Sequence, residues 1–133
     1  MPTIKIIDDD KELAENISTI LQAKGYVTSV RSKYDGAVDD LINNTPDLLI
    51  LDVMFPENLT GGFDLARQIR KIEEIRDLPI ILLTNINQEF PGDFSSHDID
   101  GEWIPVQDFL EKPVDITKLI SKIEELLAKK AAS

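Results

Sequence analysis

Three short, almost unbroken hydrophobic runs recur along the chain, with stretches of helical periodicity between them. The runs are residues 4–7, 48–51 and 80–83. Runs of this length without polar alternation are typical of strands buried on both faces, which is the mark of a parallel sheet. Two more polar strands are predicted over residues 26–30 and 107–110, and their polarity suits the edges of a sheet.

Four amphipathic patterns predict helices between and after these strands. The first follows Asp10, which is placed to cap it, and precedes Gly25, which is placed to end it. The apolar stripes are Leu13, Ile17, Ile20 and Leu21; then Val38, Leu41 and Ile42; then Phe63, Ala66, Ile69 and Ile72; and last Ile116, Leu119, Ile120, Ile123, Leu126 and Leu127. This order predicts one domain over residues 1–133, a doubly wound α/β fold with a five-stranded parallel sheet and helices on both faces.

Residues 85–106 break the alternation. A helix is expected there, but the stretch contains two prolines and two glycines and shows no helical period. Residues 85–111 also carry seven acidic side chains and no Lys or Arg. This segment is interpreted either as a solvated acidic loop or as a docking surface for a basic partner, with Trp103 pinning it to the body.

Composition narrows the class of protein. The net charge of −11 over 133 residues disfavours direct contact with nucleic acid or with anionic lipid. No apolar run approaches the roughly 18 residues that span a bilayer, and no signal-peptide pattern begins the chain, so a cytoplasmic location is expected. There is no cysteine, and His97 is the one histidine, which leaves oxygen ligands for any metal site.

Charged and hydroxyl side chains follow the predicted strands at the point where each ends. Asp8 and Asp9 follow the first strand, Asp52 the third, Thr84 the fourth and Lys112 the fifth. The carboxyl ends of parallel strands share one edge of the sheet, where ligands bind in open α/β folds. Three carboxylates with one ammonium indicate a site for a hard divalent cation, Mg²⁺. The alternative is that each residue only caps a helix or closes a turn.

Four motifs at these strand ends resemble the receiver domains of bacterial two-component response regulators. They are IIDDD, PDLLILDVMFP, IILLT and FLEKP, and the resemblance covers essentially the whole chain. It implies the strand order 2-1-3-4-5 and phosphorylation by a sensor histidine kinase or a phosphotransfer protein. It also implies a conformational switch that signals to a downstream protein, with self-catalysed phosphoryl transfer and autodephosphorylation only, rather than a metabolic enzyme.

The resemblance also implies a role for each matching residue. These are Asp52 as the phosphoacceptor and a metal ligand; Asp8, Asp9 and the backbone carbonyl of Met54 as the other metal ligands; Thr84 as the switch hydroxyl; Lys112 as the lysine before a cis Pro113; and Phe109 as the aromatic that turns inward when Thr84 moves.

Three features depart from the family pattern. Asn85 replaces the usual small residue after the switch hydroxyl, and ENLTGG between Pro56 and Phe63 is about two residues longer than usual. Residues 85–106 take the place of the fourth helix, so activation is expected to be read out through this stretch and the neighbouring strand, in a protein that stays monomeric.

Other interpretations remain. The chain could be the receiver part of a longer transcriptional regulator, or a flavodoxin-type module that binds flavin or nucleotide. The flavodoxin-type module needs a Gly-, Ser- and Thr-rich loop after the first strand, where this chain has Asp8-Asp9-Asp10. A phosphatase with Asp52 as nucleophile would need a second carboxylate at position 54, which is Met54.

Overall fold

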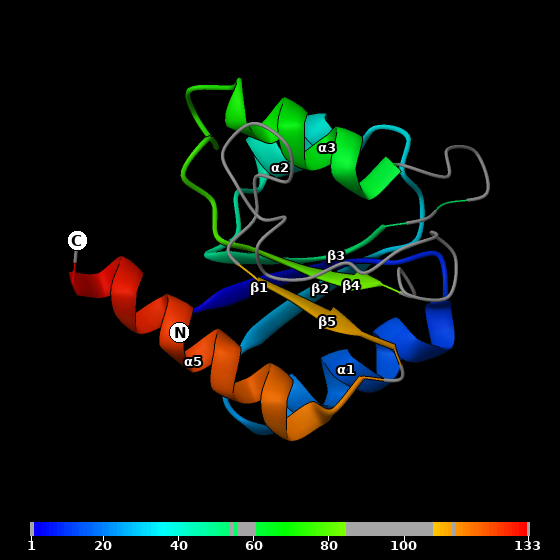
Figure 1. Ribbon diagram of the computed structural model, residues 1–133, viewed down its shortest axis with the longest axis vertical. Helices are drawn as coiled ribbons and strands as arrows, with labels where there is room; N and C mark the ends of the chain where they lie inside the picture. The colour runs from blue at the N-terminus through cyan, green and yellow to red at the C-terminus, as the bar shows by residue number, and fades with distance from the viewer. Residues whose placement is uncertain (1, 54, 56–60, 85–107, 113, 133) are drawn as a thin grey trace.

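A five-stranded parallel sheet in the order β2-β1-β3-β4-β5 forms the centre of the protein (Figure 1). The structure, a computed structural model, describes residues 2–53, 55, 61–84, 108–112 and 114–132. The strands are β1 (Thr3–Ile7), β2 (Val27–Arg31), β3 (Leu48–Asp52), β4 (Ile80–Thr84) and β5 (Asp108–Glu111). All neighbouring strands pair in parallel. The predicted parallel sheet and the strand order implied by the resemblance are therefore confirmed.

Helices cover both faces of the sheet. Those in the described part of the chain are α1 (Lys11–Ala23), α2 (Ala37–Asn43), α3 (Gly61–Arg70) and α5 (Ile116–Ala132). Figure 1 shows α2 and α3 over one face, and α1 and α5 over the other. None of these helices has the length and apolar character of a membrane-spanning segment.

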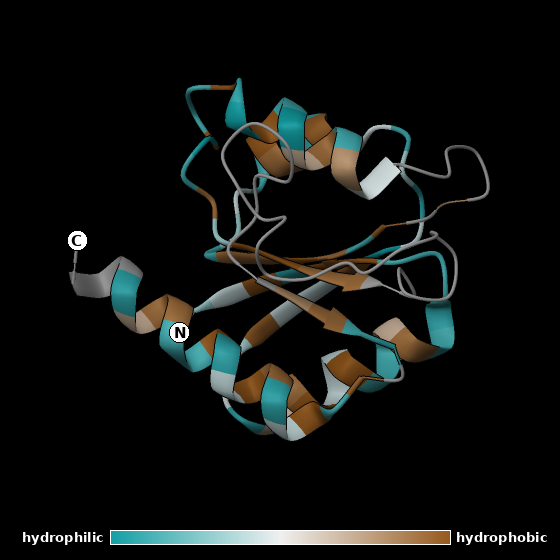
Figure 2. Ribbon diagram, in the orientation of Figure 1, coloured by the Kyte–Doolittle hydropathy of each residue, from teal (hydrophilic) through white to brown (hydrophobic). Residues whose placement is uncertain are grey.

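Alternate residues of the central strands pack into two separate hydrophobic cores, one on each face of the sheet. On β3, Leu49 and Leu51 face α2 and α3, whereas Leu48 and Ile50 face α1 and α5, and none of the four is exposed. Figure 2 shows the apolar colouring along these strands and on the sides of α2 and α3 that face them. Burial on both faces explains why the central strands read as continuous apolar runs.

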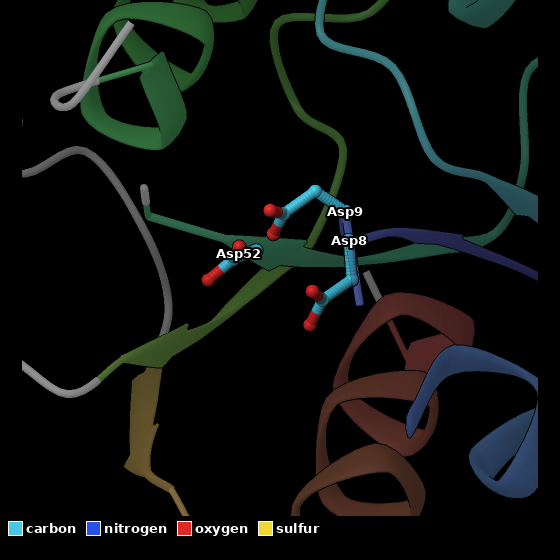
Figure 3. A group of neighbouring side chains, drawn as sticks. All are labelled: Asp8, Asp9 and Asp52. Carbon is cyan, nitrogen blue, oxygen red and sulfur yellow. The ribbon is translucent and has the colours of Figure 1, made fainter. Parts of the chain in front are cut away.

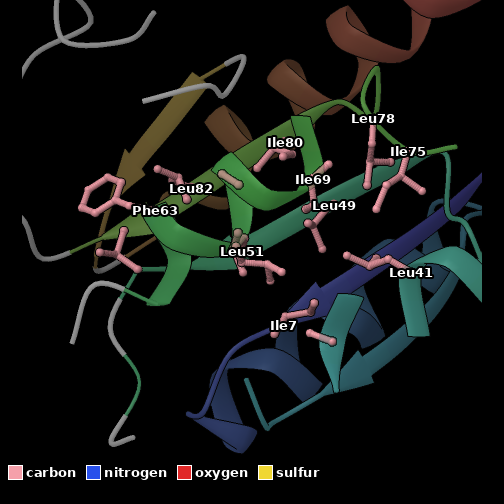
Figure 4. Close-up of a cluster of buried hydrophobic side chains, with 14 of the residues drawn as sticks. Ile7, Leu41, Leu49, Leu51, Phe63, Ile69, Ile75, Leu78, Ile80 and Leu82 are labelled. Atoms are coloured by element: carbon pink, nitrogen blue, oxygen red, sulfur yellow. The ribbon is translucent and has the colours of Figure 1, made fainter. Parts of the chain in front are cut away.

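The α2–α3 core, most of which is drawn in Figure 4, comprises Ile7, Ala37, Leu41, Leu49, Leu51, Val53, Phe55, Phe63, Leu65, Ala66, Ile69, Ile75, Leu78, Ile80 and Leu82. The α1–α5 core comprises Ile4, Ile6, Ala14, Ile17, Leu21, Leu48, Ile50, Ile81, Leu83, Leu110, Leu119 and Ile123.

The predicted ends of α1 are confirmed, and the edge strands are shifted by one residue. The carboxylate of Asp10 accepts a hydrogen bond from the N–H of Leu13 at 3.1 Å, and Gly25 follows the helix at a φ of +96°. Strand β2 begins at Val27 because the N–H of Tyr26 still bonds to the carbonyl of Leu21, in the turn that ends α1. Ile42 was predicted on the apolar stripe of α2, but it is 37% exposed.

Candidate metal centre

Three carboxylates meet at the carboxyl edge of the sheet. Asp8 and Asp9 follow β1 directly, and Asp52 is the last residue of β3. One oxygen from each lies within 4.8 Å of the others, and Figure 3 shows the three side chains gathered at this edge. Asp8 is fully buried, Asp52 is 4% exposed and Asp9 is exposed. The convergence predicted from the strand ends is therefore present.

The three consecutive aspartates after β1 have different local roles. The N–H of Asp8 donates to the carbonyl of Arg31 at 3.0 Å, which continues the pairing of β1 with β2. One oxygen of Asp8 accepts from the N–H of Asp10 at 2.9 Å, and Asp10 in turn caps α1. These bonds fix Asp8 inside the site, while Asp9 lies at its solvent side.

Lys112 supplies the positive charge of this cluster. It directly follows β5, and its Nζ lies 3.2 Å from an oxygen of Asp8 and 3.2 Å from Oδ1 of Asp52. The ammonium donates a hydrogen bond to Asp52. With all groups ionised, three carboxylates and one ammonium give the cluster a charge of −3 + 1 = −2.

Burial sets the proton affinities of the cluster. Burial raises the pKa of Asp52 to about 8, and the charge of Asp8 adds to this effect. Burial also raises the pKa of Asp8, against the opposing effects of a backbone hydrogen bond and Lys112. For Lys112, burial alone would lower the pKa, but the charges of Asp8 and Asp52 outweigh it, so the pKa is raised. The positive charge that the protein itself supplies is therefore not enough to stabilise the ionised form of both buried carboxyl groups.

The donor set fits a hard divalent cation. All three candidate ligands offer carboxylate oxygen, which Mg²⁺ and Ca²⁺ prefer over nitrogen or sulfur. A charge of +2 would balance the charge of −2 on the cluster. The exposed position of Asp9 leaves one side open to water or to a phosphoryl group.

The start of α3 packs directly against the phosphoacceptor candidate. The N–H of Gly62 donates to the carbonyl of Val53 at 2.7 Å. A Cβ at Gly62 would lie 2.6 Å from the Cα of Val53 and closer still to the carbonyl oxygen of Asp52. Sequence reasoning assigned Gly61 and Gly62 to a longer loop, but they form the first turn of α3 and are buried. The paired glycines were the available signal, because close backbone contact requires a residue without a side chain.

Several expected site residues fall wholly or partly outside the described residues. Met54, Asn85, Pro113 and residues 85–106 lie outside them, and so does the side chain of Thr84, although its backbone ends β4 opposite Glu111. Phe109 is described: it is partly buried and packs against the α2–α3 core.

Comparison with known proteins gives a consistent result. The family model of the response regulator receiver domain matches residues 4–124. The chain is 31% identical over 129 residues to the DNA-binding dual master transcriptional regulator RpaA of Synechocystis sp., over 96% of this chain and 49% of that protein. It is 30% identical to the phosphate regulon transcriptional regulatory protein PhoB of Pseudomonas aeruginosa, over 94% of this chain and 51% of that protein. The chain thus spans about half the length of the curated relatives it matches.

Solved structures match over nearly the full length of both chains. A putative response regulator from Chloroflexus aurantiacus has a TM-score of 0.79 and 31% identity, covering 96% of this chain and 98% of that one. The Francisella response regulator 1452 receiver domain has a TM-score of 0.81 and 27% identity, covering 98% and 99%.

Gly62→Ala is expected to lower the free energy of unfolding by about 2–3 kcal/mol, because the new methyl group has no space against the backbone of Asp52 and Val53. Alanine is otherwise the better helix former, so a loss of stability isolates the steric cause. Urea unfolding measures it. Gly61→Ala is the matched control, since the atoms nearest to its methyl group would be side-chain ring atoms, at 3.0 Å and beyond, and not backbone. Equal effects of the two variants would contradict this account.

The metal-free protein is expected to lose stability relative to Asp52→Asn as pH rises from 3.8 to about 8. The folded protein holds the Asp52 proton more tightly than the unfolded chain does. Ionisation of Asp52 therefore costs more free energy in the folded state than in the unfolded state. The loss of stability is complete once the pH exceeds the pKa of Asp52 in the folded protein. Lys112 stays charged in this window, because its pKa is raised from 10.5. Melting temperatures measured in chelator check this, and parallel profiles for the two proteins would contradict it.

Proposed function

The chain belongs to the response regulator receiver domain family, a signalling module of two-component signal transduction, and on this premise we propose that it accepts a phosphoryl group on Asp52. One observation carries the proposal. The buried carboxylate of Asp52 lies beside two further carboxylates and 3.2 Å from the Lys112 ammonium, at the edge of the sheet where ligands of open α/β folds bind. The donor is a phosphohistidine of a sensor histidine kinase or a phosphotransfer protein.

The reaction is an in-line displacement at phosphorus. A carboxylate oxygen of Asp52 forms the new P–O bond while the P–N bond of the phosphohistidine breaks, and the imidazole nitrogen leaves with the electron pair. The Lys112 ammonium offsets negative charge on the phosphoryl oxygens. When bound by Asp8, Asp9, Asp52 and the Met54 carbonyl, Mg²⁺ supplies further charge neutralisation.

The product is an acyl phosphate, and the protein returns to its resting state by hydrolysis. Attack of water at phosphorus releases inorganic phosphate and restores the Asp52 carboxylate. The protein therefore works as a self-resetting switch and not as a metabolic enzyme. The proposed relay runs from Thr84, which hydrogen-bonds the phosphoryl group, to Phe109, which moves inward.

A second form of the proposal places the same chemistry in a longer regulator. It is supported by the length of the curated relatives, of which the chain spans about half. One of these relatives is described as DNA-binding. The net charge of −11 disfavours DNA contact by the receiver itself, so any such contact would belong to another part of the protein. In either form the receiver signals to a downstream protein.

Asp52→Asn is expected to abolish labelling by acetyl phosphate in the presence of Mg²⁺, because an amide is not a nucleophile at phosphorus. Mass spectrometry of the intact protein measures the added phosphoryl group. Asp39→Asn, an exposed acidic residue on α2, is the matched control and is expected to label as the wild type does. Labelling of Asp52→Asn at the wild-type level would contradict the assignment of Asp52 as the phosphoacceptor.

Mg²⁺ is expected to raise the melting temperature by neutralising the three carboxylates. At a concentration ten times its dissociation constant, the gain is about 1.4 kcal/mol, or about 5 °C for a chain of this size. Asp9→Ala should remove most of this gain, while the remote Asp39→Ala should keep it. If Mg²⁺ does not change the melting temperature of the wild-type protein, the carboxylates do not form a metal site.

A further inference from the structure

The connection between β2 and α2 is tied down by Arg31, on both sides of Tyr34. The Nε of Arg31 donates to the carbonyl of Lys33 at 3.0 Å, and its Nη2 donates to the carbonyl of Asp35. The carbonyl of Arg31 accepts the N–H of Asp8, so the same residue borders the acidic site. The planar guanidinium can hold two acceptors at fixed positions, which restrains the chain around Tyr34.

The ring of Tyr34 packs against Phe55, three residues beyond Asp52. The ring centroids lie 5.6 Å apart at an angle of 47°. Phe55 is 1% exposed, and Tyr34 is partly buried against the α2–α3 core. Tilted aromatic pairs at this separation attract each other beyond the effect of buried area alone. Tyr34 therefore contacts the segment that follows Asp52, although the two are distant in sequence.

The pair of Tyr34 and Phe55 lies beside the backbone that follows Asp52. Val53 is fixed on two sides, since its N–H bonds to the carbonyl of Leu83 at 3.3 Å and its carbonyl accepts from Gly62. Phe55 is fixed by Tyr34, and both rings flank Gly61, where a Cβ would lie 3.0 Å from Phe55 and 3.1 Å from Tyr34. Tyr34, Phe55 and the start of α3 thus pack together beside the backbone of Asp52 and Val53.

We infer that Tyr34 is a positioning residue for the chemistry at Asp52. By holding Phe55 and the start of α3 at Gly61, it keeps Gly62 against the backbone of Asp52 and Val53, and so restrains the residue that carries the proposed phosphoacceptor carboxylate. The inference rests on the proposed function, and it adds a residue from the β2–α2 connection to the machinery of phosphoryl transfer. Positioning matters here because a displacement of about 1 Å can reduce a rate by up to about 100-fold.

The test compares Tyr34→Ala with Tyr34→Phe and with a matched control. Tyr26 is the other tyrosine of the chain, and it is partly buried against the opposite, α1–α5 core. Tyr34→Ala is expected to slow labelling by saturating acetyl phosphate about tenfold and to weaken Mg²⁺ binding. Tyr34→Phe keeps the ring and is expected to restore both. Tyr26→Ala removes an equal side chain and is expected to leave both unchanged.

Amide hydrogen exchange provides a readout that does not depend on labelling. Loss of the Tyr34 ring is expected to speed exchange of the Gly62 N–H, which bonds to Val53, while Tyr26→Ala leaves it at the wild-type rate. A merely structural role for Tyr34 would lower the melting temperature in both alanine variants without separating them in exchange or labelling. That result would overturn the inference.

Two further comparisons separate the role of Tyr34 from a folding defect and from failure of the proposed function. If Tyr34→Ala does not fold, Tyr34→Leu retains apolar volume without the ring, and normal labelling and Gly62 exchange in that variant would overturn the inference. If the wild type does not label at all, the proposed function fails. If the wild type labels and Tyr34→Ala labels equally fast, only the role of Tyr34 fails.

Discussion

The burial of two carboxylates beside each other is the constraint on which this structure depends. Asp8 and Asp52 are almost completely removed from water, and Lys112 contacts both. Burial, with the charge of Asp8 added to it, raises the pKa of Asp52 to about 8, and the single Lys112 ammonium does not offset this effect. Ionising both buried carboxyl groups costs folding free energy that a bound divalent cation would offset, and perturbed carboxyl groups of this kind are enriched at functional sites.

The rest of the fold holds this unfavourable cluster in place. The parallel register brings the ends of β1 and β3 to one edge, and β5 delivers Lys112 to the same edge. Gly62 lets α3 pack against the backbone of Asp52 and Val53, and Arg31 accepts the backbone N–H of Asp8. Two cores of buried apolar side chains stabilise the sheet that carries these groups.

Fold alone would not separate the possible functions. The strand order 2-1-3-4-5 is shared with flavodoxin-type proteins, which bind ligands at the same edge. The difference lies after β1, where Asp8 and Asp9 repel a phosphate unless a cation intervenes, whereas a flavodoxin-type loop would cradle it. The family match agrees with the site: the chain is a response regulator receiver domain, and its three clustered carboxylates are consistent with a metal site of that family.

The sequence by itself determined the parallel sheet, the cap at Asp10 and the set of residues at the strand ends. Apolar runs and strand termini are local patterns, and parallel strands necessarily bring their carboxyl ends to one edge. Only the tertiary structure decided that Gly61 and Gly62 begin α3, that Ile42 faces outward, and that Tyr34 reaches Phe55. These features depend on contacts between segments that are distant in the chain, and no local pattern encodes which backbone or ring will lie opposite.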